Sequence, residues 1–283
     1  MSDPQPSGLS PGLYIVATPI GNLSDLSPRA AAILAQADAI AVEDSRVTAK
    51  LLHHIGARRP MVPYHDHSAD HVRPQLIARM ANEAIALVSD AGTPLISDPG
   101  YKLVRDARAA GVPIVTIPGP CATIAALTLS GLPTDRFLFM GFLPPKEKAR
   151  ADAIAEAAGI RATLVFYVSG PQLARTLAAL REGLGDREAA VCREISKRFE
   201  ETVTGSLGEL AVRYADQPPK GEIVLVVAPP GEAPPPAADD VDGLLRTALA
   251  DLPIAKAAAR VQQITGLPRR TLYARAMELR EDM

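Results

Sequence analysis

Short apolar runs alternate with helical segments along the first half of this chain, and this alternation restricts its fold more than any other feature. The apolar runs lie in residues 12–22, 38–44, 84–88 and 112–120. A helical segment follows each of them, and the one at 27–37 opens with a Ser cap and a Pro at its first position. Strands that alternate with helices usually pair in parallel. We therefore expect an α/β fold with a mostly parallel sheet covered by helices on both faces.

A second series of strands begins near Arg136. The expected strands lie in 136–144, 161–170, 187–196 and 221–229, with a helix in 171–183. A proline-rich acidic stretch follows, and helices are expected beyond it. The predicted organisation is an N-terminal α/β domain at 12–125, a C-terminal α/β domain at 126–229, a linker at 230–240 and a helical tail at 241–283.

Composition narrows the class of protein. The 283 residues suffice for about two domains, and 47% hydrophobic with 22% charged residues fit a soluble globular chain. A net charge of -2 gives no overall attraction to nucleic acid, so such a contact needs a local patch. Two cysteines make no disulfide framework, and we expect no signal peptide and a cytoplasmic location. Prolines and glycines interrupt the uncharged stretch 109–134, which excludes a membrane-spanning helix there.

Three loops that leave the expected strands of the first domain are rich in Gly and Pro: "ATPIGN", "SDAGTPLISDPG" and "PGPCAT". Ligands of parallel sheets bind at the carboxyl ends of the strands, where these loops should meet. Glycine lets backbone approach a ligand, and Asp90 or Thr93 could bind a ribose hydroxyl or an amine. The alternative is three ordinary strand-to-helix turns. Neither a dinucleotide-binding nor a P-loop motif is present.

Charged residues follow a strand in each domain. Glu43, Asp44 and Arg46 come directly after the second expected strand and could orient a substrate or accept a proton. They could equally be the acidic start of a helix. In "REISKRFEE", Lys197 and its neighbours could bring a base and cations to the cleft, or form cross-strand pairs on a solvated edge. Cys121 has no basic neighbour and is expected to be a small packed residue.

The stretch "YHDHSADH" places His65, His67 and His71 close together. A zinc site is possible, since His-x-His occurs in such sites, but no cysteine joins them and we expect no metal.

Residues 255–279 resemble a helix-turn-helix, with Gly266 in the turn and Arg269 and Arg270 opening the second helix. Together with Lys256 these arginines could contact phosphates. The alternative is a packing or dimer-capping helix pair.

Six motifs in order resemble a known family. They are "LYIVATPIGNLSDLS", "AVEDSRVTAKLL", "LVSDAGTPLISDPGYKLV", "TIPGPCATIAALTLSGLP", "REISKRFEE" and "KGEIVLVV", and the helical tail matches as well. From Gly12 to the C-terminus the chain resembles the bacterial small-subunit ribosomal RNA methyltransferase I family of the tetrapyrrole methylase superfamily. One segment departs from that family's usual F-Y-E-S-P-H-R, because this chain has Val168, Gly170, Pro171 and Gln172 there.

This resemblance implies two α/β domains of tetrapyrrole-methylase type with S-adenosylmethionine between them, plus the helical tail. It implies methylation of a cytidine 2'-hydroxyl in 16S rRNA of the small subunit, near the decoding centre, by a homodimer. The cofactor-binding residues that it implies are Pro19, Ile20, Gly92, Thr93, Pro94, Ile96, Cys121, Ala122, Tyr167 and Val226. Asp90, a candidate from the second Gly/Pro-rich loop, is expected to bind the cofactor with them.

The hypothetical mechanism assigns proton acceptance to Glu43 or Asp44. Arg46 and Lys197 are then expected to hold phosphate or the developing oxyanion. Two alternatives remain: a precorrin or related porphyrinoid C-methyltransferase on the same fold, and a non-catalytic nucleic-acid-binding regulator built on the tail.

Overall fold

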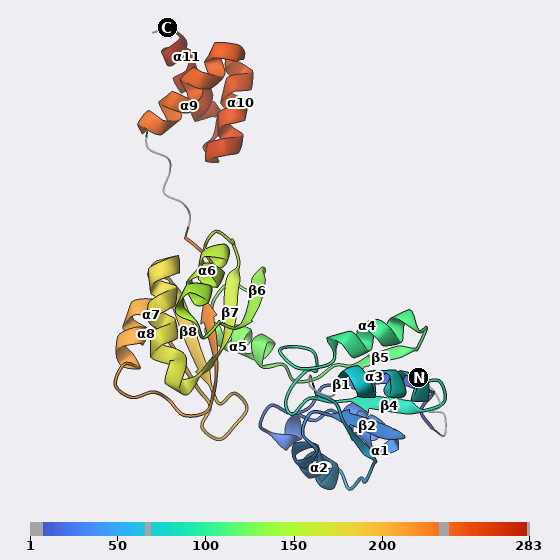
Figure 1. Ribbon diagram of the computed structural model, residues 1–283. Coiled ribbons are helices and arrows are strands. Elements are labelled where there is room, and N and C mark those ends of the chain that lie inside the picture. Colours follow the sequence, from blue (N-terminus) through green and yellow to red (C-terminus); the bar gives the residue numbers. More distant parts are fainter. Residues whose placement is uncertain (1–7, 66–68, 232–237, 282–283) are drawn as a thin grey trace. The chain divides into compact units, whose positions relative to one another are not determined.

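The computed structural model describes residues 8–65, 69–231 and 238–281 (Figure 1). It divides into two compact units, residues 1–229 and 230–283.

The first sheet of the larger unit is parallel throughout, as predicted. Its strands are β1 (Gly12–Val16), β2 (Ala39–Val42), β3 (Met61–Pro63), β4 (Ala84–Leu87) and β5 (Ile114–Ile117), in the order β3-β2-β4-β1-β5. The short β3 was not expected, because it has three residues, lies at the sheet edge and ends in a proline. A strand that is half exposed gives no strong apolar signal.

Helices cover both faces of this sheet. They are α1 (Pro28–Gln36), α2 (Ser45–His54), α3 (Ala69–Arg79) and α4 (Tyr101–Ala109), with a 3₁₀ turn, η1 (Leu23–Asp25), after β1. Leu34 of α1 and Leu52 of α2 pack in one core, and Leu76 of α3 and Leu103 of α4 pack in another. Ser27 caps α1 by accepting from the Ala30 amide at 3.1 Å, as the sequence predicted.

The second sheet is mixed, which differs from the pattern of the first. Its strands are β6 (Phe137–Phe142), β7 (Thr163–Ser169), β8 (Glu188–Arg193), β9 (Glu201–Ser206) and β10 (Glu222–Val227), in the order β6-β7-β10-β8-β9. Only β6 and β7 pair in parallel. The polar edge strand β9 was not expected. It forms because its backbone pairs with β8 after a short connection, although "ETVTGS" carries little apolar signal.

Helices α6 (Glu147–Ala158), α7 (Leu173–Leu184) and α8 (Leu207–Arg213), with a 3₁₀ turn η2 (Gly170–Gln172), share one core with this sheet. Helix α5 (Ala122–Ser130) covers the other face, where Ala126 and Leu127 pack with Val165 and Val224. The predicted domain boundary at residues 125 and 126 falls within this helix. We propose that α5 is the connection between the two domains.

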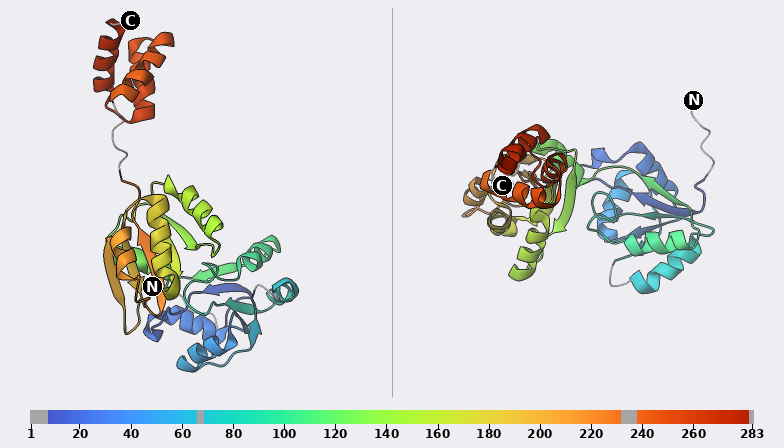
Figure 2. Two further views of the ribbon diagram at one scale, coloured as in Figure 1. Left: turned by 60° about the vertical axis from the view of Figure 1, so that its left-hand side comes forward. Right: turned by 90° about the horizontal axis from the view of Figure 1, so that it is seen from above.

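The smaller unit is a three-helix bundle of α9 (Ala238–Asp251), α10 (Ile254–Thr265) and α11 (Arg269–Glu281), drawn orange to red in Figure 2. Leu245, Val261 and Leu272, one from each helix, are fully or almost fully buried in its core. Gly266 ends α10 with a φ of 71°, so it supplies the left-handed residue that the turn requires, as predicted. Among the described residues, no helix is long and apolar enough to cross a bilayer.

Candidate functional site

The three Gly/Pro-rich loops meet at the carboxyl edge of the first sheet. Thr18, after β1, and Gly92, after β4, exchange two backbone hydrogen bonds of 2.8 and 3.0 Å. Thr93 Oγ1 donates to the Pro120 carbonyl oxygen, after β5, at 3.0 Å. The expectation that these loops lie together is therefore confirmed, and hydrogen bonds rather than proximity alone hold them.

The loop after β4 has an unusual backbone. Gly92 has a φ of 81° and Gly100 a φ of 133°, which favour glycine. Leu95 and Ser97 have φ values of 76° and 63°, a region that costs free energy for residues with a Cβ atom. Such residues cluster at ligand-binding and catalytic sites, where surrounding contacts hold them.

A cavity of about 350 Å³ lies between these loops and the second sheet, within the larger unit. A volume of this size suits a small ligand or cofactor. From the side of the first sheet it is lined by Ile20, Ala91, Gly92, Thr93, Ile96, Ser97, Asp98, Cys121 and Ala122. From the second-sheet side it is lined by Phe142, Tyr167, Val168, Ser169, Ile195, Gly221, Glu222, Ile223 and Val224.

Most residues expected to bind a cofactor line this cavity. They are Ile20, Gly92, Thr93, Ile96, Cys121, Ala122 and Tyr167. Pro19 and Pro94 are chain neighbours of lining residues but are not part of the wall themselves. Val226 is fully buried within the sheet core, and Ile223 and Val224, nearer the start of β10, reach the cavity instead.

Asp90 hydrogen-bonds to another loop of the protein and does not line the cavity. Its Oδ1 accepts a hydrogen bond from the backbone amide of Asp44 at 3.0 Å, which ties the loop after β4 to the start of α2. The structure therefore gives Asp90 a partner in the protein, whereas Thr93, the other candidate from the same loop, lines the cavity.

Asp44 caps helix α2. Its side chain accepts from the Arg46 amide at 2.8 Å and pairs with the Arg46 guanidinium at 2.6 Å. The side-chain hydrogen bond from Arg46 is the main reason that the pKa of Asp44 falls to about 2. So low a pKa makes a carboxylate a weak proton acceptor. Glu43, Asp44 and Arg46 do not line the cavity.

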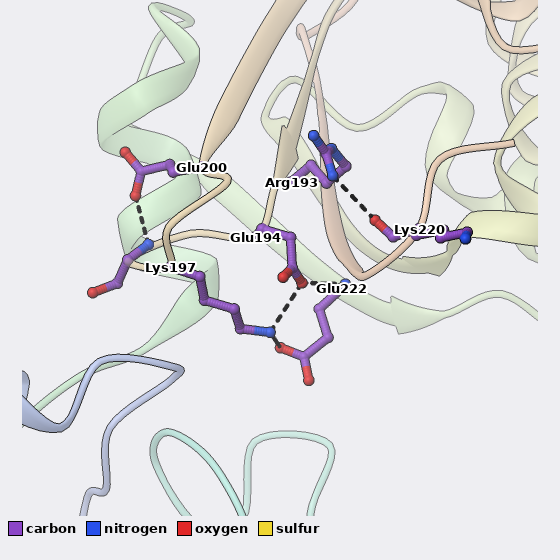
Figure 3. A network of polar contacts seen from close by, with 7 residues as sticks. Arg193, Glu194, Lys197, Glu200, Lys220 and Glu222 are labelled. Atoms are coloured by element: carbon purple, nitrogen blue, oxygen red, sulfur yellow. Dashed lines mark hydrogen bonds and ion pairs between the residues drawn. The ribbon is translucent and has the colours of Figure 1, made fainter. Parts of the chain in front are cut away.

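Lys197 lies at the centre of a polar network (Figure 3), and one member of that network, Glu222, lines the cavity. Its Nζ donates to Glu194 Oε1 at 3.0 Å and to Glu222 Oε2 at 2.9 Å. Burial alone lowers the pKa of Lys197, but the hydrogen bonds to both carboxylates outweigh it and raise that pKa. The ammonium group is thus held charged between two acids.

The Lys197 network also reaches the segment that follows β1. The aliphatic stem of Lys197 lies over Gly21, where a Cβ atom would overlap it, and the Ser196 hydroxyl hydrogen-bonds to Asp25. Glu194 and Ser196 have φ values of 52° and 65°, so this loop is strained like the one opposite. The arrangement fixes the loop after β8 against the loop after β1.

Asp98 is a cavity residue that the sequence analysis did not single out. It is half buried, and burial raises its pKa to about 6, with smaller contributions in the same direction from Glu43 and Asp90. A hydrogen bond with Ser89 acts the other way. The sequence offered one indication of this role: Asp98 lies in "SDAGTPLISDPG", a stretch that was expected to bind a ligand.

Gly170 explains part of the departure at residues 168–172. A Cβ atom at this position would overlap the Pro219 carbonyl oxygen, so the chain at 219–221 can lie against it only if residue 170 is glycine. Gly221 in turn lines the cavity, as do Val168 and Ser169. The altered segment thus forms part of the cavity wall by close backbone packing.

In the smaller unit, Lys256, Arg269 and Arg270 are all exposed. Arg269 donates to the Ala255 carbonyl oxygen at 3.3 Å, which holds its side chain against the start of α10, the part of the helix that contains Lys256. Arg270 follows Arg269 in the first turn of α11.

His67 of the histidine-rich stretch lies outside the described residues. Within the described ranges, no three His, Cys, Asp or Glu side chains are arranged to hold a metal ion.

The fold and the loop-lined cavity define a tetrapyrrole methylase. The family model of the tetrapyrrole (corrin/porphyrin) methylases matches residues 12–211, and that of the RsmI C-terminal HTH domain matches residues 235–280. The chain belongs to the ribosomal RNA small subunit methyltransferase I family of these methylases. It is 53% identical to that protein of Erythrobacter litoralis (strain HTCC2594) over 96% of both chains. It is 42% identical to that of Escherichia coli O157:H7 over 94% of both chains.

Solved structures agree on the fold. Diphthine synthase superimposes with a TM-score of 0.62 at 17% identity, covering 76% of this chain and 89% of that one. Uroporphyrin-III C-methyltransferase from Thermus thermophilus, complexed with S-adenyl homocysteine, gives 0.53 at 20% identity, covering 77% of this chain and 97% of that one. The predicted fold class and family are therefore confirmed.

Proposed function

We propose that the protein transfers the methyl group of S-adenosylmethionine to the 2'-hydroxyl of a cytidine in 16S rRNA near the decoding centre. Family membership makes it an S-adenosylmethionine-dependent methyltransferase of small-subunit rRNA. The proposal adds to this the methylated nucleotide, a cytidine, and the acceptor atom, its ribose 2'-oxygen. The observation that carries it is the match to rRNA methyltransferases over 96% of the chain, including the helical tail.

The cavity residues fit this cofactor. Gly92 has no side chain to fill the space beside Ile20 and Pro120, so its backbone can approach a ligand. Ile20, Ala122 and Tyr167 offer apolar surface to a purine, and the Thr93 hydroxyl is a polar contact within the same wall. When bound, S-adenosylmethionine supplies a methyl group already activated by the sulfonium charge.

The protein must then orient the acceptor oxygen and exclude water. Ile195 and Ile223 place apolar surface on the cavity wall, which favours a dry site. We propose that Lys197 is a positioning residue, because its ammonium group already bonds two carboxylates and its stem fixes the loop at Gly21. The side chain of Arg46 is 86% exposed, which leaves it able to contact an RNA phosphate.

RNA binding is proposed for the tail. Lys256, Arg269 and Arg270 are exposed cations of a helix-turn-helix unit, and phosphate contacts by such residues position a nucleic acid. We also propose a cytoplasmic location and a homodimer, both on the strength of the family resemblance.

Nucleoside mass spectrometry tests the proposal. Purified protein and S-adenosylmethionine are incubated with small ribosomal subunits from cells that lack the gene. The expected product is one 2'-O-methylcytidine in the 16S rRNA. No rRNA methylation despite tight S-adenosylmethionine binding would contradict it and favour a porphyrinoid acceptor.

A further inference from the structure

We propose that Asp98 is the catalytic base that accepts the proton of the attacking ribose hydroxyl. The inference rests on the proposed function, because it names a residue for that reaction. It replaces the sequence-based choice of Glu43 or Asp44, neither of which lines the cavity.

The position of Asp98 carries the proposal. It shares the cavity wall with Gly92 and Thr93, on the side where the loops of the first sheet meet. Among the described residues that line the cavity, the only other carboxylate belongs to Glu222. That carboxylate bonds the Lys197 ammonium group at 2.9 Å, and an ion-paired carboxylate is the weaker proton acceptor.

The backbone holds Asp98 in place. Ser97, directly before it, has a φ of 63°, and Pro99, directly after it, restricts the backbone of residue 98. At Gly100 a Cβ atom would lie 3.0 Å from Leu87 and 3.2 Å from Leu95, so the loop returns tightly against the sheet. A side chain held on a strained, packed loop keeps its orientation when a substrate binds.

The surroundings of Asp98 favour proton acceptance. Burial is the main cause that raises its pKa to about 6, and the negative charges of Glu43 and Asp90 add to it. The hydrogen bond with Ser89 opposes this rise in the pKa of Asp98. Tyr167 is a further titratable group nearby: burial is the main cause that raises its pKa, and the charge of Asp98 raises it further. A base with a pKa near 6 is largely ionised at neutral pH yet binds a proton better than an exposed aspartate.

The step balances without a further reactant. The 2'-oxygen forms a bond to the methyl carbon while the bond from that carbon to sulfur breaks, and its electron pair stays on sulfur. The hydroxyl proton passes to the Asp98 carboxylate. Water takes that proton after the products leave.

The test compares Asp98→Asn and Asp98→Glu with the wild type in single-turnover methylation of small subunits at saturating S-adenosylmethionine. The Asn variant should lose about 10²- to 10⁴-fold in rate, the usual contribution of a general base. Its affinity for S-adenosylmethionine, measured by calorimetry, should be unchanged, which also shows that it folds. The Glu variant should recover part of the rate. The wild-type rate should rise with pH around 6, and the Asn variant should lack that rise.

Asp152→Asn, which removes an exposed carboxylate of α6, is the matched control and should match the wild type. An Asn variant at Asp98 with the wild-type rate and pH profile would overturn this proposal alone. A loss of rate accompanied by an equal loss of cofactor affinity would overturn it too, because Asp98 would then hold the cofactor. A wild type that methylates no rRNA would overturn both proposals.

Discussion

The hydroxyl of Thr123, in the first turn of α5, and the phenol of Tyr167, on β7, lie 3.1 Å apart and hydrogen-bond beside the cavity. The Tyr167 ring also meets Phe139 and Phe142 edge-on, with centroids 4.9 and 5.5 Å away. Because Cys121 and Ala122, just before Thr123, line the cavity, this bond holds the loop after β5 against the second sheet.

Tyr167→Phe should therefore loosen that loop while keeping the ring packing. The change leaves the buried Thr123 hydroxyl without its partner, so we expect a loss of about 1 kcal/mol in the free energy of unfolding, measured in urea. S-adenosylmethionine affinity should fall several-fold. Tyr214→Phe, which removes a phenol from the core on the far side of the second sheet, should lower stability without changing that affinity. Equal effects of both variants on affinity would contradict this role of Tyr167.

Gly21→Ala should displace Lys197. The added Cβ atom overlaps the Lys197 stem, and the φ of 145° disfavours any side chain. Gly56→Ala is the matched control, since Gly56 also has a positive φ, 67°, but nothing lies within 4 Å of its Cβ position. We expect the Gly21 variant to lose more stability and, unlike the control, to methylate more slowly. The double variant Gly21→Ala with Lys197→Ala should regain some of the lost stability. Identical unfolding of the two single variants would show that the stem contact is unimportant.

Gly170→Ala should disturb the cavity wall by a purely steric route. Its Cβ atom would overlap the Pro219 backbone oxygen, which cannot move aside as a flexible side chain can. The cost should reach the range of about 1 to 3 kcal/mol typical of overpacking, with weaker S-adenosylmethionine binding, because Gly221 and Glu222 follow in the displaced segment. Gly159→Ala, with open space at its Cβ position, should be neutral in thermal unfolding and calorimetry. A Gly170 variant as stable as this control would contradict the close packing.

Two variants of Asp44 should distinguish the contribution of its capping hydrogen bond to stability from the contribution of its negative charge. Asp44→Asn keeps an oxygen for the Arg46 amide, whereas Asp44→Ala removes it, so the Ala variant should have the lower Tm. Because the folded pKa of Asp44 is depressed to about 2, its charge stabilises the fold above the ordinary value of 3.8 and loses that effect as the pH falls toward 2. The Tm difference between wild type and the Asn variant should accordingly shrink in that window. A difference that grows on acidification would have the wrong sign.

Arg269→Ala and Arg270→Ala should weaken rRNA binding and leave S-adenosylmethionine binding unchanged. Each lost phosphate contact should also reduce the slope of affinity against salt by about one, as measured by filter binding. Arg246→Ala, on the exposed part of α9, is the control of equal charge. If all three variants bind RNA alike while the first two change the dimerisation constant, the helix pair serves packing between copies.

Local signals in the sequence specified many features of this fold. The alternation of apolar runs and helices predicted the parallel first sheet, and Ser27 and Gly266 marked a helix start and a helix end where the structure has them. The three Gly/Pro-rich loops predicted where a ligand would bind, because topology brings the carboxyl ends of parallel strands to one edge. These features depend on residues that are neighbours in the chain or on a rule of sheet geometry.

The tertiary structure alone decided which polar groups are free to act. Nothing near Asp44 in sequence separates a base from a helix cap, and nothing near Lys197 reveals that Glu222, on another strand, neutralises it. Edge strand β9 and the antiparallel pairs of the second sheet also depend on distant partners. Asp98 differs from other aspartates because it is half buried beside a cavity with two further acids near it. The burial of a side chain and the charges around it depend on residues that are distant in the sequence. They are therefore decided only when the chain has folded, and the pKa of the side chain is decided with them.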